Sequence, residues 1–73
     1  FTFYPNPVVD VLHLDNLLLS KASVYSVLGQ LIASITFEKT TSNTLDLTNL
    51  EKGIYLIVLE NDTQQKTIKI VKQ

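Results

Sequence analysis

No cysteine occurs among the 73 residues of this chain, and histidine occurs only once. Without cysteine the chain forms no disulfide, and without a Cys/His cluster it lacks the usual ligands of a structural metal. A domain of this size buries only about 60% of the surface of its unfolded chain. Its stability must therefore come from packed apolar side chains, and 45% of the residues are hydrophobic.

Arginine is also absent, and six lysines against seven acidic residues leave a formal net charge of -1. Nucleic-acid binding relies on many Lys and Arg contacts with phosphates, so we expect no nucleic-acid partner. The charge is nevertheless uneven, because residues 64–73 carry no acid and three lysines, Lys66, Lys69 and Lys72. These lysines either protect an edge strand from aggregation or form a positive patch for a partner.

Catalytic signatures are missing as well. His13 has no cysteine to pair with and no Gly-x-Ser-x-Gly segment, so a nucleophilic triad cannot be assembled. The carboxylates are spread singly, unlike those of a calcium loop, and the two glycines, Gly29 and Gly53, form no phosphate loop. We therefore expect no enzyme activity, no cofactor and no metal, and we interpret His13 as a solvated or hydrogen-bonded residue.

What the chain does contain is a series of short segments rich in β-branched residues, separated by turn residues at the spacing of sandwiches and barrels. Helical periodicity is absent. The pattern predicts one all-β domain over residues 1–73, a small antiparallel immunoglobulin-like β-sandwich of about seven strands, with an open barrel as the alternative. The expected strands are Thr2–Tyr4, Val8–Leu14, Lys21–Val27, Leu31–Glu38, Thr44–Leu47, Ile54–Glu60 and Lys66–Lys72.

The connections between these strands carry recognisable turn residues. Tyr4–Pro7 holds two prolines and predicts a stiff entry to the second strand. One leucine of Leu17–Leu19 should close the end of the sandwich, and Thr40–Asn43 should be a polar loop. Gly29 permits a turn with positive φ, and Asn61–Asp62 supplies the last hairpin turn.

The segment from Thr48 to Glu51 matches a capping box, in which a hydroxyl and a carboxylate satisfy each other's backbone donors. Gly53 follows where a left-handed residue ends such a turn. We therefore expect one tight turn here, with positive φ at Gly53. In the second strand, Leu12 and Leu14 should face the core, and the Asp10 carboxylate should accept backbone N–H bonds.

The strand Ile54–Glu60 is apolar on both of its faces. Its run to Leu59 is the longest apolar stretch, which suits a strand and falls far short of the about 20 residues needed to span a bilayer. A two-layer sandwich buries only one face of each sheet. Either a loop such as Leu17–Leu19 covers the second face, or that face is a docking surface for another protein.

Three motifs occur in order along almost the whole chain. Pro7 and Asp10 form an early Pro-x-x-Asp element, Leu-Gly-Gln lies at residues 28–30, and Leu50 precedes a Gly-x-Tyr at Gly53 and Tyr55. A basic strand, Lys66–Lys72, follows them. In this order and spacing they resemble the type A C-terminal sorting domain that Bacteroidetes attach to cargo of the type IX (Por) secretion system.

The resemblance implies a non-catalytic secretion signal at the end of a larger exported protein. Its partners would be an N-terminal passenger domain, an outer-membrane barrel shuttle, the translocon, and a surface sortase that often removes the signal. The cargo would pass through the periplasm and the outer membrane to the cell surface or the medium. The residues implied in partner recognition are Pro7, Asp10, Gly53, Tyr55, Lys69 and Lys72.

The chain also departs from that family, because it ends in Gln73 and not in a basic residue. It begins at Phe1 without Met, so we expect it to be part of a longer protein. The main alternative function is an accessory carbohydrate-binding module that presents Tyr25 or Tyr55 to a sugar, and a structural spacer is the third. Alternation along the last strand sends Ile68 and Ile70 to the core, which predicts that the final three residues contribute little to it.

Overall fold

A computed structural model describes residues 1–73, which form five antiparallel strands in a single sheet. β-Branched and aromatic residues are frequent in all of these segments but one, the leucine-rich strand β2, as expected of strands that pack on a half-buried surface. The strands are β1 (Thr2–Tyr4), β2 (Val11–Ser26), β3 (Leu31–Asp46), β4 (Gly53–Glu60) and β5 (Gln65–Lys72).

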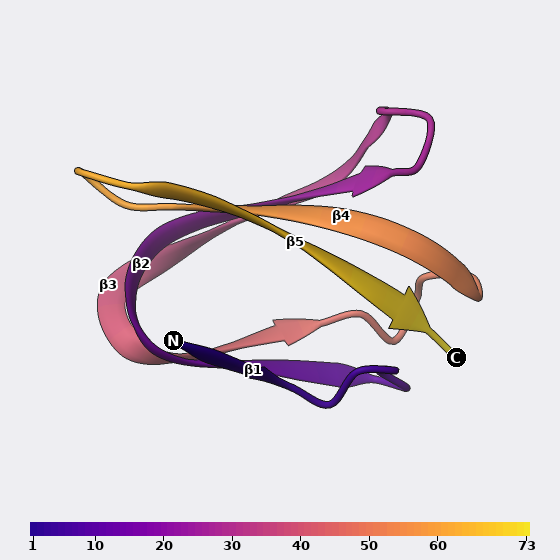
Figure 1. Cartoon of the computed structure of the whole chain (residues 1–73), viewed down its shortest axis with the longest axis horizontal. Helices are drawn as coiled ribbons and strands as arrows, with labels where there is room; N and C mark the ends of the chain where they lie inside the picture. The colour runs from indigo at the N-terminus through magenta and orange to yellow at the C-terminus, as the bar shows by residue number, and fades with distance from the viewer.

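The sheet folds into two layers because β2 and β3, each 16 residues long, bend together half way along their length (Figure 1). The lower layer holds β1 with the first part of β2 and the last part of β3. The upper layer runs in the order β3, β2, β4, β5. The β2–β3 register shifts between Asp15 and Leu19 and again before Lys21, which is how bulges bend a strand pair.

The prediction of about seven strands is therefore wrong, although the all-β antiparallel class is confirmed. Leu17–Leu19 and Thr40–Asn43 were expected to connect strands, but both stay extended inside β2 and β3. Positive φ angles at Asn16 (64°) and Lys39 (52°) turn the chain without ending its pairing. The layers are thus two arms of one bent sheet, and the separate sheets of an immunoglobulin-like sandwich are not observed.

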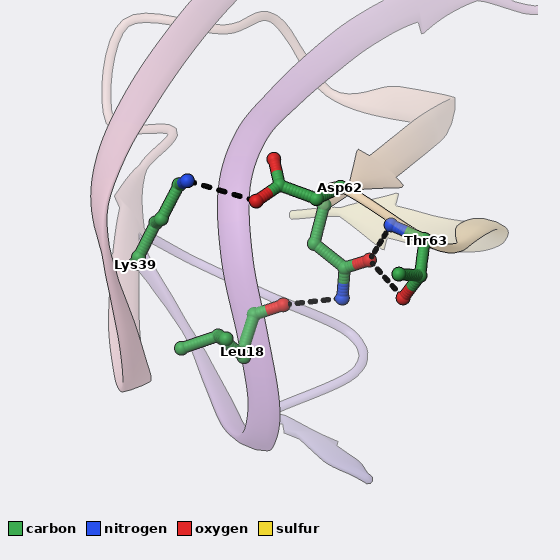
Figure 2. Close-up of a pocket in the computed structure, with 5 residues that line it drawn as sticks. Leu18, Lys39, Asp62 and Thr63 are labelled. Carbon is green, nitrogen blue, oxygen red and sulfur yellow. Dashed lines mark hydrogen bonds and ion pairs between the residues drawn. The ribbon is translucent and has the colours of Figure 1, made fainter.

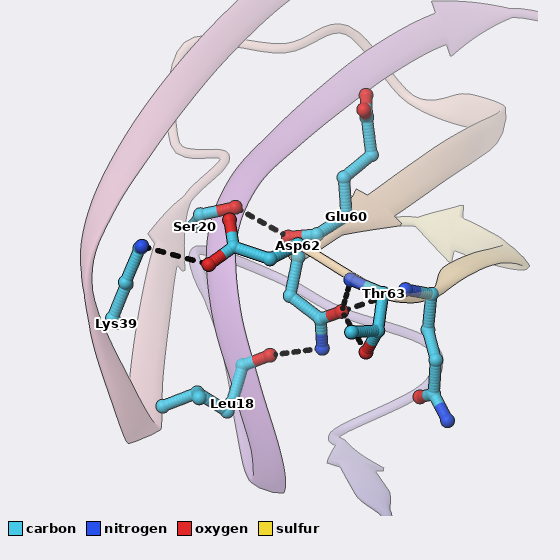
Figure 3. A network of polar contacts seen from close by, with 8 residues as sticks. Leu18, Ser20, Lys39, Glu60, Asp62 and Thr63 are labelled. Carbon is cyan, nitrogen blue, oxygen red and sulfur yellow. Dashed lines mark hydrogen bonds and ion pairs between the residues drawn. The ribbon is translucent and has the colours of Figure 1, made fainter.

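The β4–β5 turn lies beside the bend and is tied to it by polar contacts (Figures 2 and 3). The Asn61 side-chain amide donates to the Leu18 carbonyl at 2.6 Å, and the Ser20 hydroxyl donates to the Glu60 carbonyl at 3.1 Å. Lys39 pairs with Asp62 at 2.8 Å, although both side chains are exposed. The predicted hairpin turn at Asn61–Asp62 is confirmed, and its side chains also tie β4 to the bent strands.

The core lies between the two arms and is made of aliphatic side chains. Leu12 and Leu14 are fully buried, as predicted, and Leu19 is the leucine of its segment that enters the core. The polar residues between them point outward, which is the alternation that gives a half-buried strand its two faces. The buried apolar residues are Val8, Leu12, Leu14, Leu19, Ala22, Val24, Leu45, Leu47, Ile57, Leu59 and Ile70.

Candidate recognition surface

The outward side of the upper layer carries a continuous group of apolar side chains. One row crosses all four strands, because Tyr25 pairs with both Leu31 and Leu56, and Leu56 pairs with Lys69. Val58 lies one row further along β4, between Ser23 and Thr67. We name this surface the outer patch, and its members are Tyr25, Leu31, Ile54, Leu56, Val58 and Val71.

No element of the chain covers the outer patch. Within the sheet β4 lies between β2 and β5, and the lower layer packs against its inward side, where Ile57 and Leu59 enter the core (Figure 1). Leu17–Leu19 lies in the bend of β2, where Leu19 enters the core and Leu18 contacts the β4–β5 turn. The loop that could have hidden the second face of β4 therefore does not do so.

The β2–β3 hairpin extends the exposed apolar surface from Leu31 of the outer patch to the hairpin tip. Leu31 is 55% exposed, and Val27 and Leu28 in the tip are 61% and 93% exposed, which are high fractions for aliphatic side chains. Gly29 has a φ of 87°, so the predicted positive-φ turn at this glycine is confirmed. The Leu-Gly-Gln motif thus forms a tight, apolar hairpin tip that nothing in the chain buries.

The three C-terminal lysines point in different directions and do not make one patch. Lys69 is exposed on the outward side, beside Leu56. The Lys66 ammonium lies 5.8 Å from the centre of the Phe1 ring, within cation–π range. Lys72 is only 7% exposed, and its ammonium donates to the Gln73 carbonyl at 3.1 Å. Only Lys69 therefore offers its charge beside the outer patch.

The chain just before and within the Pro-x-x-Asp element lies along the outer edge of β5. The Asn6 side chain accepts a hydrogen bond from the Val71 amide at 3.0 Å and donates one to the Lys69 carbonyl at 3.5 Å. Val8 follows with an isolated parallel bridge to Lys72. Pro7 is exposed between these two contacts. The sequence pattern placed Asn6 only within the stiff Tyr4–Pro7 entry and did not predict this pairing, because the two segments lie at opposite ends of the chain.

The final residues also carry more of the fold than the alternation pattern predicts. The Val8 amide donates to the Val71 carbonyl and the Gln73 amide donates to the Val8 carbonyl, both at 2.8 Å. Val8 is fully buried, so the last three residues hold a core side chain in place. Asp10 has a local role, since its carboxylate accepts the Val11 amide at 2.7 Å.

The turn before β4 forms without the predicted capping box. Both the amide and the hydroxyl of Thr48 donate to Asp46, the last residue of β3, so Thr48 is not paired with Glu51. These bonds lower the pKa of the Asp46 carboxyl below its ordinary value, the Thr48 hydroxyl contributing most. A tight turn is still present, closed by the bond from Leu50 N–H to the Leu47 carbonyl.

Gly53 and Tyr55 connect the turn to the start of β4. Gly53 has a φ of 153°, which is positive as predicted but far from the left-handed helical value. The Tyr55 ring packs against the core, and its hydroxyl donates to the Glu51 carbonyl at 2.7 Å. Tyr55 therefore ties the turn to β4 from the inner side, and its ring is not presented outward to a sugar.

The lower layer shows a different, polar surface. The His13 and Tyr4 rings stack with centres 4.9 Å apart, and the Tyr4 hydroxyl donates to the Asp15 carboxylate at 2.9 Å. The bond to Asp15 and its negative charge raise the pKa of Tyr4. Ser42 donates to the same carboxylate at 3.3 Å. No group of three or more His, Cys, Asp or Glu side chains is arranged to hold a metal ion.

Comparison with known protein families gives a match along almost the whole chain. The family model of the secretion system C-terminal sorting domain matches residues 2–73. Neither the curated proteins nor the solved structures yield a match. No helix in the structure is long and apolar enough to span a bilayer. Because the family match extends from the β1 strand to the end of the chain, this protein belongs to the C-terminal sorting domains of the type IX secretion system.

Proposed function

We propose that this domain is a non-catalytic address tag, which directs an N-terminal passenger through the periplasm and across the outer membrane by way of the type IX secretion system. The outer patch is the surface that the machinery contacts. Cargo carrying the tag then reaches the cell surface or the medium. The observation that carries this proposal is the uncovered outward face of β4, in a domain of the sorting family.

An exposed apolar face is costly for a small exported domain, because it invites aggregation and contributes nothing to folding. Burial of apolar surface stabilises an interface by about 25 cal/mol for each Å² removed from water. The outer patch supplies such surface, with the Tyr25 ring as the kind of side chain that anchors interfaces. Lys69 at its margin favours a partner with carboxylates beside an apolar area.

The residues named by the sorting motifs divide into two groups under this proposal. Lys69 touches the partner directly, since its side chain is exposed next to Leu56. Pro7, Asp10, Gly53 and Tyr55 act by shaping the turns that bring the strands into place. Lys72 is buried and does not lie on the outer patch.

The implied partners follow from the family and remain part of the proposal. They are the outer-membrane barrel shuttle, the translocon and a surface sortase. In this scheme the shuttle receives the folded domain, and the sortase removes it and can join the cargo to anionic lipopolysaccharide. The domain itself supplies binding surface, and no step of the chemistry is assigned to its side chains.

A matched pair of leucine substitutions tests the docking surface. Leu31→Ser alters the outer patch, whereas Leu18→Ser removes a comparably exposed leucine at the bend, the two being 55% and 45% exposed. A fluorescent passenger is fused before Phe1 and its export is followed by pulse-chase. We expect Leu31→Ser to hold the passenger in the periplasm and Leu18→Ser to export it normally, with similar melting curves. Equal export of both fusions would remove the outer patch from recognition.

A further inference from the structure

The outer edge of β5 is only partly paired. On its inner edge β5 pairs with β4 along its whole length. On the other edge, no strand pairs with Gln65–Thr67, and the only bridge is that between Val8 and Lys72. Backbone donors and acceptors at an unpaired strand edge are the groups to which an extended segment of another chain can add.

The chain itself occupies the C-terminal half of this edge, through residues 6–8, which we name the clip. The clip makes four hydrogen bonds, to the Lys69 carbonyl, to the amide and carbonyl of Val71 and to the Gln73 amide. These are the backbone groups of alternate residues along the outer edge of β5. The clip therefore imitates a parallel strand, with the Asn6 side-chain amide in place of a backbone peptide group.

The clip is weaker than a true strand. Pro5 and Pro7 have no backbone N–H to donate, so the chain around Asn6 cannot form a continuous ladder. One of the two Asn6 bonds is long, at 3.5 Å, and both Asn6 and Pro7 are exposed. The anchor is the single buried side chain of Val8. A segment held in this way is a candidate for local opening without unfolding of the sheet.

The clip also decides whether Lys72 is accessible. Lys72 bridges to Val8, is only 7% exposed and gives its ammonium to the Gln73 carbonyl. Release of the clip frees the backbone edge between Lys69 and Gln73 and removes one wall from around the Lys72 side chain. The hydrogen-bonding edge and the terminal cation would then become available together.

We propose that the outer edge of β5, from Lys69 to Gln73, is a strand-addition site that the clip keeps closed in the free domain. Its partner is an extended peptide segment, which pairs parallel to β5 through backbone hydrogen bonds once the clip is displaced. That this segment belongs to the secretion machinery rests on the proposed function. The closed edge and its release are properties of the chain alone and are tested without the machinery.

Lysine acetylation of the 73-residue chain measures the clip directly. Lys69 is exposed and serves as the internal reference for the buried Lys72. We expect Asn6→Ala to speed acetylation of Lys72 by about three- to tenfold, as for a segment that loses one or two hydrogen bonds. Lys69 should react at an unchanged rate. Asn49→Ala is the control, because Asn49 is exposed and its side chain makes no hydrogen bond, and Asn6→Asp should keep the acceptor for Val71.

Amide hydrogen exchange separates local opening from general loss of stability. In Asn6→Ala, the amides of Val71 and Gln73 should exchange faster while those of the central strand β4 stay protected. The idea fails if Lys72 and Val71 behave as in the wild type. It fails equally if the β4 amides accelerate to the same extent, because Asn6 would then be an ordinary stabilising residue.

A peptide added in trans tests whether the edge accepts a strand. The double variant Asn6→Ala/Val8→Ala is mixed with a synthetic peptide of residues 3–11. We expect millimolar peptide to restore slow acetylation of Lys72, while a scrambled peptide does not. Unchanged acetylation with the peptide, in a variant whose β4 amides are still protected, would overturn strand addition at this edge. These outcomes do not depend on export, so the proposed function can fail separately.

Discussion

The two faces of strand β4 have similar side chains and different surroundings. Ile57 and Leu59 point inward and are at most 1% exposed, whereas Ile54 on the outward face is 42% exposed. Leu56 and Val58 are half-buried by their neighbours in the sheet alone. Apolar residues on a face that no layer covers do not serve the core. This contrast separates residues that build the core from residues that leave an uncovered apolar face along one strand.

The largest expected effect comes from truncating the inward face. Ile57→Ala deletes a fully buried side chain and should lower the free energy of unfolding by about 2 to 5 kcal/mol. Its outward neighbour provides the contrast, because Val58→Ala should cost less than about 1 kcal/mol at a half-buried site. Urea unfolding of both variants gives the two values. Similar losses would show that the outward face is as important to folding as the core.

A substitution at Gly53 tests how far the placement of both faces of β4 depends on the positive φ at its first residue. Gly53→Ala places a side chain at a φ of 153°, where a Cβ would meet no atom within 4 Å. The loss of unfolding free energy then comes from backbone strain and is about 1 to 3 kcal/mol. Because Gly53 begins β4, this strain affects the placement of the inward and the outward side chains alike. Thermal unfolding measures it, with Lys52→Ala as the control at the exposed neighbouring position. A melting temperature equal to that of the wild type would show that the turn adjusts to an L-residue.

A substitution of Tyr55 tests whether this residue of the inward face serves folding or contact with a partner. Tyr55→Phe keeps the ring against the core but removes the 2.7 Å bond to the Glu51 carbonyl. We expect a loss of about 0.5 to 1.5 kcal/mol in unfolding free energy and unchanged export. Loss of export with an unchanged melting curve would instead make Tyr55 a contact residue.

The smallest effect lies outside both faces, at Asp46. Thr48→Val removes the hydroxyl that contributes most to the lowered pKa of this carboxyl, so the pKa should rise toward its ordinary value. A carboxyl whose pKa is lowered on folding stabilises the fold above its unfolded pKa, and this contribution is lost as the pH falls through the folded value. The loss belongs to the region below about pH 4 and is small, since the group is exposed. Titration of the Asp46 carboxyl by NMR reports the shift, and an unmoved pKa would assign it to another cause.

Several features of this fold were predictable because they depend on residues close in the chain. The bounds of β1, the burial of Leu12 and Leu14, the turn at Gly29 and the two apolar faces of β4 all follow from alternation and turn chemistry. The family was predictable for a similar reason, since its motifs are short and ordered along the sequence. The absence of a cover over the outer patch was left open, because only the arrangement of the layers decides it.

The errors have a common cause in pairing between distant segments. Polar or leucine-rich segments such as Thr40–Asn43 and Leu17–Leu19 look like connections, yet both stay extended within the long strands, and Leu19 pairs with Thr40. Thr48 donates its hydrogen bonds to Asp46 and not to Glu51, because β3 ends at Asp46, directly before the turn. Local patterns cannot rank such competing partners.

The sequence by itself determined the all-β class, the burial of Leu12 and Leu14 and the membership in the sorting-domain family, because these depend on alternation, turn residues and ordered motifs. Only the tertiary structure decided that four predicted strands merge into two bent ones, that Asn6 covers the edge of β5 and that Lys72 is buried. Each of these depends on hydrogen bonds or packing between residues that are far apart in the chain. Such contacts form only when the sheet bends and brings its two arms together, and no local pattern encodes them.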